Sequence, residues 1–149
     1  MVGTVFLSFT RRSLTLVFAL LAVSVFGCSP RSEQGLSSES DRTLRRAFDA
    51  QARNLQVEGR GVVKRILPDD NEGSRHQRFV LELSSGQTLL IAHNIDLATR
   101  IPNLQPGDEV DFCGEYDWNP EGGVIHWTHH DPAGRHPDGW LKHHGQTYR

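Results

Sequence analysis

Five apolar-rich runs of strand length follow one another between residues 56 and 129, separated by short breaks rich in Gly, Pro, Ser or Asn. Runs of this length and spacing predict β-strands joined by turns. The expected strands are 56–67, 76–83, 87–94, 109–118 and 124–129. In the fourth, Val110, Phe112 and Tyr116 alternate with polar residues, so that they would share one face of a sheet. The chain is therefore expected to fold as a mainly β protein.

The order of these strands favours a small OB-like barrel. Gly59 and Gly61 lie inside the first run, where glycine is typical of a bulge or a sharp bend. Residues 94–105 lose the strand pattern and favour a short helix or helical turn. A bent first strand and an irregular connection after the third strand are typical of a five-stranded Greek-key barrel. A small β-sandwich or roll built from the same strands is the alternative.

One amphipathic helix is expected before the barrel. Leu44, Ala47, Phe48 and Gln51 recur at helical spacing, which predicts a helix over 41–54 with Ser40 or Asp41 as its N-cap. The helix is expected to cover one end of the barrel. Residues 41–149 would then form a single domain, because their number suffices for one compact core and not for two.

The first 27 residues have the pattern of a signal peptide. They contain no Asp or Glu, and Arg11 and Arg12 precede an apolar run from Leu14 to Phe26 that is too short to span a bilayer as a helix. The segment 25–28, ending in Cys28, resembles the lipobox of bacterial lipoproteins, which predicts lipidation of Cys28 and a flexible tether over 28–40. The protein would then be periplasmic and anchored to a membrane, by Sec or twin-arginine export. Ordinary cleavage, giving a soluble periplasmic or secreted protein, is the alternative.

Charge and cysteine content narrow the classes of partner. Without residues 1–27 the chain keeps 14 basic and 18 acidic residues, a formal charge of −4. An acidic domain lacks the basic surface of non-specific nucleic-acid binders, so nucleic acid is not an expected partner. A lipidated Cys28 would leave Cys113 as the only thiol, without an internal disulfide. The expected partners are the membrane and a small ligand or metal ion.

Six of the eight histidines fall within the last 24 residues, and this concentration indicates a metal site. In a regular strand His126 and His130 would stand roughly 13 Å apart on one face, too far for one ion. A metal site therefore requires one of two arrangements. Either the strand ends near His129, so that His129, His130 and Asp131 can converge, or further metal ligands come from the hairpin 76–94. His143 and His144 are expected to be exposed and outside the site. The predicted ligands of one transition-metal ion, zinc favoured, are His76, His93, His126, His129, His130 and Asp131.

The turn between the second and third strands decides whether two of these histidines meet. A two-residue turn at 85–86 would make His76 and His93 diagonal neighbours on one face. A three-residue turn at 84–86 would send them to opposite faces. The sequence leaves both registers open.

Three polar phrases, at 66–79, 90–97 and 126–132, resemble a family of small bacterial proteins known only as a domain of unknown function. The similarity covers roughly Leu44 to Tyr148. It implies a secreted or lipid-anchored bacterial protein and brings no established activity or catalytic residue. A weaker similarity, to metal-dependent nucleases of the His-Asn-His type, rests on His129, His130, His136 and His143. The glycines and prolines of 132–139 leave little room for the helix that those enzymes require.

Three functions remain open from the sequence. The leading hypothesis is a non-enzymatic module that binds a ligand or a metal ion. A metal-dependent, nuclease-like hydrolase would use the same histidines, one activating a water that Asp131 orients or deprotonates as a base. A structural envelope protein would use the histidines only for packing.

Overall fold

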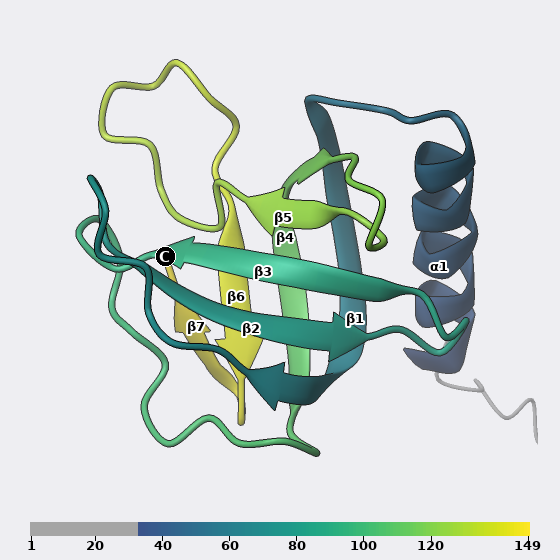
Figure 1. The fold of residues 1–149 in the computed structure, drawn as a ribbon, viewed down its shortest axis with the longest axis horizontal. Coiled ribbons are helices and arrows are strands. Elements are labelled where there is room, and N and C mark those ends of the chain that lie inside the picture. The colour runs from purple at the N-terminus through teal and green to yellow at the C-terminus, as the bar shows by residue number, and fades with distance from the viewer. Residues whose placement is uncertain (1–32) are drawn as a thin grey trace, which may run out of the picture.

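The barrel consists of β1 (Leu55–Ile66), β2 (His76–Glu82), β3 (Thr88–Asn94), β4 (Glu109–Asp117) and β5 (Val124–His126). These bounds come from a computed structural model that describes residues 33–149, with side chains from residue 39 onward. The strands are hydrogen-bonded in the order β1-β2-β3-β5-β4, and β4 pairs with β1 to close the barrel (Figure 1). Only the pairing of β3 with β5 is parallel. The prediction of a mainly β, OB-like five-stranded barrel is confirmed.

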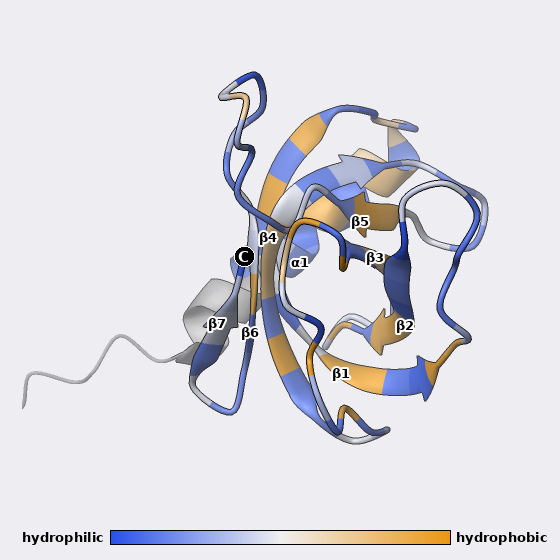
Figure 2. Cartoon of the chain, turned by 90° about the vertical axis from the view of Figure 1, so that its left-hand side faces the viewer, coloured by the Kyte–Doolittle hydropathy of each residue, from blue (hydrophilic) through white to orange (hydrophobic). Residues whose placement is uncertain are grey.

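The barrel is filled by alternate residues of its strands, as the sequence pattern predicts. Every second residue of β2, β3 and β4 is buried, and apolar and polar residues alternate along the ribbons in Figure 2. Successive side chains of a strand point to opposite faces, so one face of each strand fills the core and the other meets solvent. The largest fully buried apolar side chains include Phe79, Leu81, Ile91, Phe112, Tyr116 and Ile125.

Strand β1 belongs to both halves of the barrel. It pairs with β4 from Leu55 to Val62 and with β2 from Val62 onward, with a register shift between Val63 and Arg65. Gly59 leaves room for the ring of Phe112, its partner across the β1–β4 ladder, because a Cβ atom there would sit 2.6 Å from Cζ of Phe112. The irregularity expected in this strand lies after the glycines, at the register shift between Val63 and Arg65.

Helix α1 (Glu33–Asp49) covers one end of the barrel, as expected (Figure 1). Leu44 and Ala47 are buried in the core, and Phe48 lies against Trp118. The helix ends with Gln51 in a left-handed conformation (φ 51°), followed by an Ala52 N–H bond to the Ala47 carbonyl. Among residues 33–149 no helix is long and apolar enough to cross a membrane.

The start of the helix differs from the prediction. The helix begins at Glu33, so the expected start at 41 is wrong, and residues 33–40 are helical where a flexible tether was expected. Asp41 does not cap the helix. Its carboxylate accepts the Ser84 hydroxyl (2.5 Å) and the Ser85 N–H (2.9 Å) of the β2–β3 turn. The predicted signal peptide and the predicted lipidation site, Cys28, lie outside the described residues.

The β2–β3 hairpin has the three-residue turn 84–86. The Leu83 N–H donates to the Gln87 carbonyl across this turn. The ladder then places His76 opposite Asn94 and Gln77 opposite His93. His76 and His93 therefore point to opposite faces, with His93 fully buried. In the connection after β3, the Ala98 N–H bonds to the Asn94 carbonyl, which is the single helical turn expected there.

Two further strands, β6 (Trp140–His143) and β7 (Gln146–Tyr148), were not predicted. Strand β6 pairs with residues 110–113 of β4, and β5 pairs with residues 115–117 along the same edge. Leu141 and Tyr148 are buried. These strands extend the sheet beyond β4 (Figure 1).

The predicted fifth strand, 124–129, ends three residues early. Trp127 adopts a left-handed conformation (φ 51°), which turns the chain away from β4 into a loop over 127–139, called here the histidine loop. Of the two arrangements that the sequence left open, the structure has the strand ending short of His129, so His126 and His130 do not share one strand face. The loop returns at Gly139, whose N–H bonds to the His129 carbonyl. The histidine loop projects from the barrel in Figure 1.

Candidate metal centre

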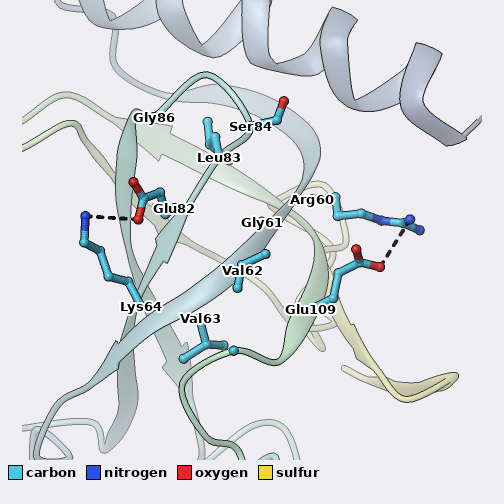
Figure 3. Close-up of a pocket in the computed structure, with 11 residues that line it drawn as sticks. Arg60, Gly61, Val62, Val63, Lys64, Glu82, Leu83, Ser84, Gly86 and Glu109 are labelled. Carbon is cyan, nitrogen blue, oxygen red and sulfur yellow. Dashed lines mark ion pairs between the residues drawn. The ribbon is translucent and has the colours of Figure 1, made fainter.

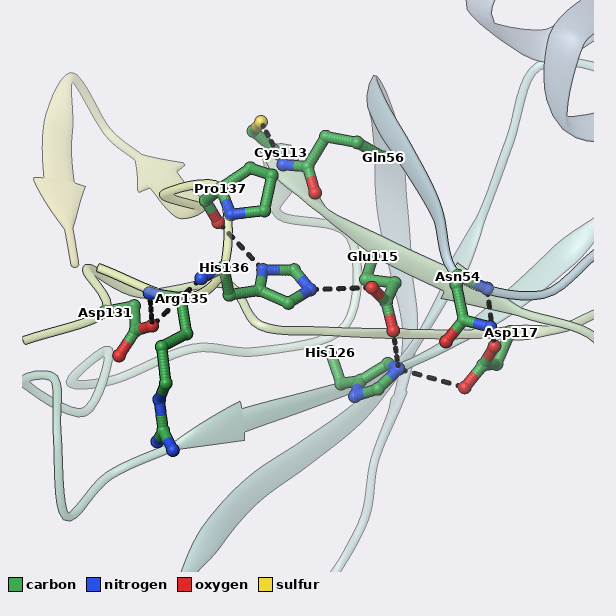
Figure 4. A network of polar contacts seen from close by, with 10 residues as sticks. All are labelled: Asn54, Gln56, Cys113, Glu115, Asp117, His126, Asp131, Arg135, His136 and Pro137. Carbon is green, nitrogen blue, oxygen red and sulfur yellow. Dashed lines mark hydrogen bonds and ion pairs between the residues drawn. The ribbon is translucent and has the colours of Figure 1, made fainter. Parts of the chain in front are cut away.

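The outer face of β4 and β5 brings Glu115, Asp117 and His126 together (Figure 4). His126 lies directly opposite Glu115 in the ladder. Its Nε2 atom is 3.1 Å from Asp117 Oδ2 and 3.4 Å from Glu115 Oε1. One donor atom from each residue lies within 4.8 Å of the other two. This group, called here the β4–β5 cluster, is a possible metal-binding group.

The β4–β5 turn fixes the register that forms this cluster. The Asn119 side-chain oxygen accepts the N–H groups of Glu121 and Gly123, at 3.0 and 2.9 Å. An asparagine that bonds its own turn in this way stabilises the connection between strands. The Asn54 N–H donates to Asp117 Oδ1 (2.9 Å), which leaves Oδ2 facing His126.

His136 reaches the cluster from the histidine loop. Its Nε2 atom is 2.6 Å from Glu115 Oε2, and its Nδ1–H donates to the Pro137 carbonyl (3.0 Å). Burial favours the neutral ring, but the Pro137 carbonyl and the Glu115 carboxylate outweigh burial and raise the pKa of His136 above 6.5. His136 therefore holds one oxygen of Glu115 while the other oxygen faces His126 (Figure 4).

Asp131, predicted as a ligand, organises the histidine loop. Its carboxylate accepts the N–H groups of Ala133 (3.0 Å), Arg135 (2.7 Å) and His136 (3.0 Å). Bonds from the N–H groups of Ala133 and Arg135, followed by that of His136, lower the pKa of Asp131. The carboxylate thus fixes the backbone that carries His136.

His93, also predicted as a ligand, is bonded at both nitrogens. Its Nε2–H donates to the Thr99 carbonyl (3.2 Å), so Nδ1 accepts the Thr128 hydroxyl (2.8 Å). Burial lowers the pKa of His93 to about 4. The structure places a neutral, structural histidine here, with neither nitrogen left for an ion.

The remaining predicted ligands lie apart from the cluster. His129 is buried and donates from Nδ1 to the His130 carbonyl (2.7 Å), whereas the exposed His130 lies 2.8 Å from Asp138. His76 pairs through its backbone with Asp70. Two groups of side chains that could hold a metal ion are found among residues 39–149. Of the six predicted ligands, only His126 belongs to one of these groups.

A second such group contains Asp108, His143 and His144. His143 was expected to be exposed, and this is wrong, because only 5% of its surface is accessible and its Nε2 lies 3.0 Å from Asp108 Oδ2. The pairing of β6 with β4 buries it. His144 is exposed, as expected.

Sequence reasoning missed Glu115, Asp117 and Asp108 as candidate metal ligands. The alternation in β4 correctly places Glu115 and Asp117 on its polar face, but acidic residues on a strand face are usually only solvated. The available signal was the spacing: His126 is the third residue of the next strand, across a short turn from Asp117. A hairpin of this length brings such residues together on one face.

The larger of the two grooves described has a different character from the cluster. It measures about 590 Å³ and lies along β1 beside the end of β2, with the half-exposed Val62 at its centre (Figure 3). Its charged side chains are neutralised in pairs, Lys64 with Glu82 (3.0 Å) and Arg60 with Glu109 (3.2 Å). It therefore offers no convergent group for chemistry, and no residue of the β4–β5 cluster lines it.

The family described as "Protein of unknown function (DUF3465)" matches residues 29–149. No curated protein matches the chain.

Proposed function

We propose that this chain, which belongs to the DUF3465 family, binds a divalent transition-metal ion, zinc by preference, through Glu115, Asp117 and His126. The supporting observation is the spacing of the donor atoms. A tetrahedral zinc ion with bonds of about 2.0–2.2 Å holds its ligand atoms about 3.4 Å apart. His126 Nε2 lies 3.1 and 3.4 Å from the two carboxylates, and the carboxylate oxygens lie within 4.8 Å of each other, a spacing that side-chain rotation can close around an ion.

The charge and chemistry of the cluster suit such an ion. The three ligands, two carboxylates and a neutral imidazole, present two negative charges to a divalent cation, and His136 offsets part of this charge at the far oxygen of Glu115. Oxygen and imidazole donors together are typical of zinc, manganese and iron sites, and zinc binds more tightly than manganese or iron(II) to a given set of this kind. On binding, the ion takes the place of the proton between His126 and Asp117.

Neighbouring groups support the orientation of the ligands. The Asn54 N–H holds Asp117, and His136 holds Glu115, each at the oxygen turned away from His126. Hydrogen bonds of this kind fix ligand orientation in metal sites and raise affinity. This arrangement supports binding through preformed geometry.

A metal-dependent hydrolase is the second candidate function. Three protein donors leave a fourth position of a tetrahedral ion for water, which a bound zinc ion activates. Binding is favoured, because neither of the two grooves described includes a residue of the cluster. Zinc-loaded protein that hydrolyses a phosphodiester, with the activity lost in His126→Ala, would favour the hydrolase.

The test of metal binding uses the full chain, purified without a histidine tag and titrated with zinc by calorimetry. We expect His126→Ala to weaken the β4–β5 site by about 100-fold or more, because it removes a direct ligand. His130→Ala, at an exposed histidine outside the cluster, is the control and should bind as the parent does. Loss of binding in His130→Ala with retention in His126→Ala would overturn the assignment.

We also propose that the protein is exported and anchored to a membrane through lipidated Cys28. The support is the lipobox-like sequence after an apolar segment of signal-peptide length. Cys28→Ala should release the protein into the soluble fraction. Unchanged partitioning of the variant into membranes would contradict the anchor.

A further inference from the structure

We infer that the protein has a second metal site, formed by Asp108, His143 and His144 at the opposite end of β4 from Asp117. His143 Nε2 lies 3.0 Å from Asp108 Oδ2, and donor atoms of all three residues lie within 4.8 Å of one another. The first spacing is close to the roughly 3.4 Å that a tetrahedral ion imposes on its ligands. An ion there would displace the proton shared by His143 and Asp108.

Two of the three ligands are held in place by the fold. The side chains of His143 and Asp108 are only 5% and 10% exposed. The Asp108 carboxylate accepts the Gln105 N–H (3.0 Å), and the Asp108 N–H donates to the Gln105 carbonyl (3.2 Å). His143 is fixed by the pairing of β6 with β4, opposite Val110. Ligands ordered before binding lose little conformational entropy when an ion arrives.

The third ligand stands at an unusual backbone position. His144 and Gly145 form the two-residue turn between β6 and β7, and both are left-handed, with φ of 47° and 80°. Asn or Gly is preferred at the first position of such a turn, and a histidine there is strained. The turn lays the His144 ring on the His143 ring, with centroids 3.8 Å apart. Because His144 is exposed, its ring can rotate toward the ion.

The donor set indicates which ions the site takes. Two imidazoles and one carboxylate are richer in nitrogen than the β4–β5 cluster, and such sets favour zinc, copper(II) and nickel(II) over manganese. Three protein ligands leave the remaining positions to water. Glu115 follows Asp108 by seven positions along the chain, roughly 23 Å in a strand, so the two sites bind independently.

Zinc titration of the full, untagged chain by calorimetry tests this inference. We expect two binding events, of which His144→Gln removes one and leaves the other. His144 is exposed in a turn, so its replacement does not threaten the fold. His130→Gln, at another exposed histidine, is the matched control and should retain both events.

The outcomes separate this inference from the proposed β4–β5 site. Glu115→Gln should remove only the event that survives in His144→Gln. A single event lost in His144→Gln and kept in Glu115→Gln would support the second site and contradict the first. Unchanged stoichiometry and affinity in His144→Gln would overturn the second site, whatever Glu115→Gln does.

Discussion

The imidazole ring of His136 stacks on the indole ring of Trp127, with centroids 4.3 Å apart and planes 5° apart. Trp127 is the first residue after β5, and His136 lies near the end of the same loop and bonds to Glu115 of β4. The contact therefore closes the histidine loop onto the β4–β5 cluster. The stability of this loop and the geometry of the cluster are linked through Glu115.

Asp131→Ala should loosen this loop. It removes the acceptor of three backbone N–H groups, and we expect a loss of about 1–3 kcal/mol in the free energy of unfolding. Amide hydrogen exchange should accelerate at Arg135 and His136. Asp131→Asn keeps an acceptor oxygen and should have a smaller effect. Equal protection of these amides in the parent and in Asp131→Ala would contradict the role of the carboxylate.

The buried His93 should make the protein less stable in acid. Its pKa is about 4 in the folded protein and 6.5 as the ordinary value, so between these values the unfolded chain takes up a proton that the folded chain does not. Stability is therefore complete above pH 6.5 and falls as the pH drops to about 4, by about 3 kcal/mol.

Urea unfolding across this pH range measures the effect. His93→Gln removes the titrating group and should reduce the loss of unfolding free energy between pH 6.5 and 4, even if the variant is less stable at pH 7. His130→Asn, at an exposed position, should leave the decline unchanged. The account of His93 fails if His93→Gln loses as much stability between pH 6.5 and 4 as the parent.

Gly139→Ala should be far more damaging than Gly134→Ala in the same loop. A Cβ atom at 139 would lie 1.9 Å from the Trp127 carbonyl oxygen and 2.6 Å from that of Cys113, both backbone atoms that cannot move aside. We expect a cost of about 3 kcal/mol or more. Gly134 has open space and φ of 60°, so its cost should be about 1–2 kcal/mol. Denaturant midpoints rank the two, and equal midpoints would contradict the close approach.

Leu141→Ala tests whether β6 belongs to the core. Leu141 is fully buried, and its truncation should cost about 2–5 kcal/mol. Lys142→Ala, one residue away and exposed, should change stability by less than about 0.5 kcal/mol. A Leu141→Ala variant as stable as Lys142→Ala would show that β6 packs loosely.

The barrel could be predicted because its strands are marked by residue patterns within short stretches of the sequence. Alternation in β4 marks the buried face of that strand, and the glycines of β1 stand where neighbouring strands leave little room for a side chain. The early end of β5 could not be predicted in this way. Trp127 turns away because the returning chain at Gly139 and strand β6 occupy the rest of the β4 edge, and this contact is set by tertiary packing.

The candidate sites depended on pairings between distant segments. A count of histidines directed attention to His129, His130 and Asp131, whose side chains bond within the histidine loop. His126 was among the predicted ligands, but the residues that lie beside it, Glu115 and Asp117, follow from the β4–β5 register. His143 meets Asp108 only through the unpredicted pairing of β6 with β4.

The most direct test of the central claim is anomalous diffraction from crystals of the protein grown with zinc. The account predicts a zinc peak about 2.0–2.2 Å from His126 Nε2 and from oxygens of Glu115 and Asp117. Zinc bound instead by His129, His130 and Asp131, or an ordered β4–β5 cluster without zinc in crystals that hold zinc elsewhere, would contradict it.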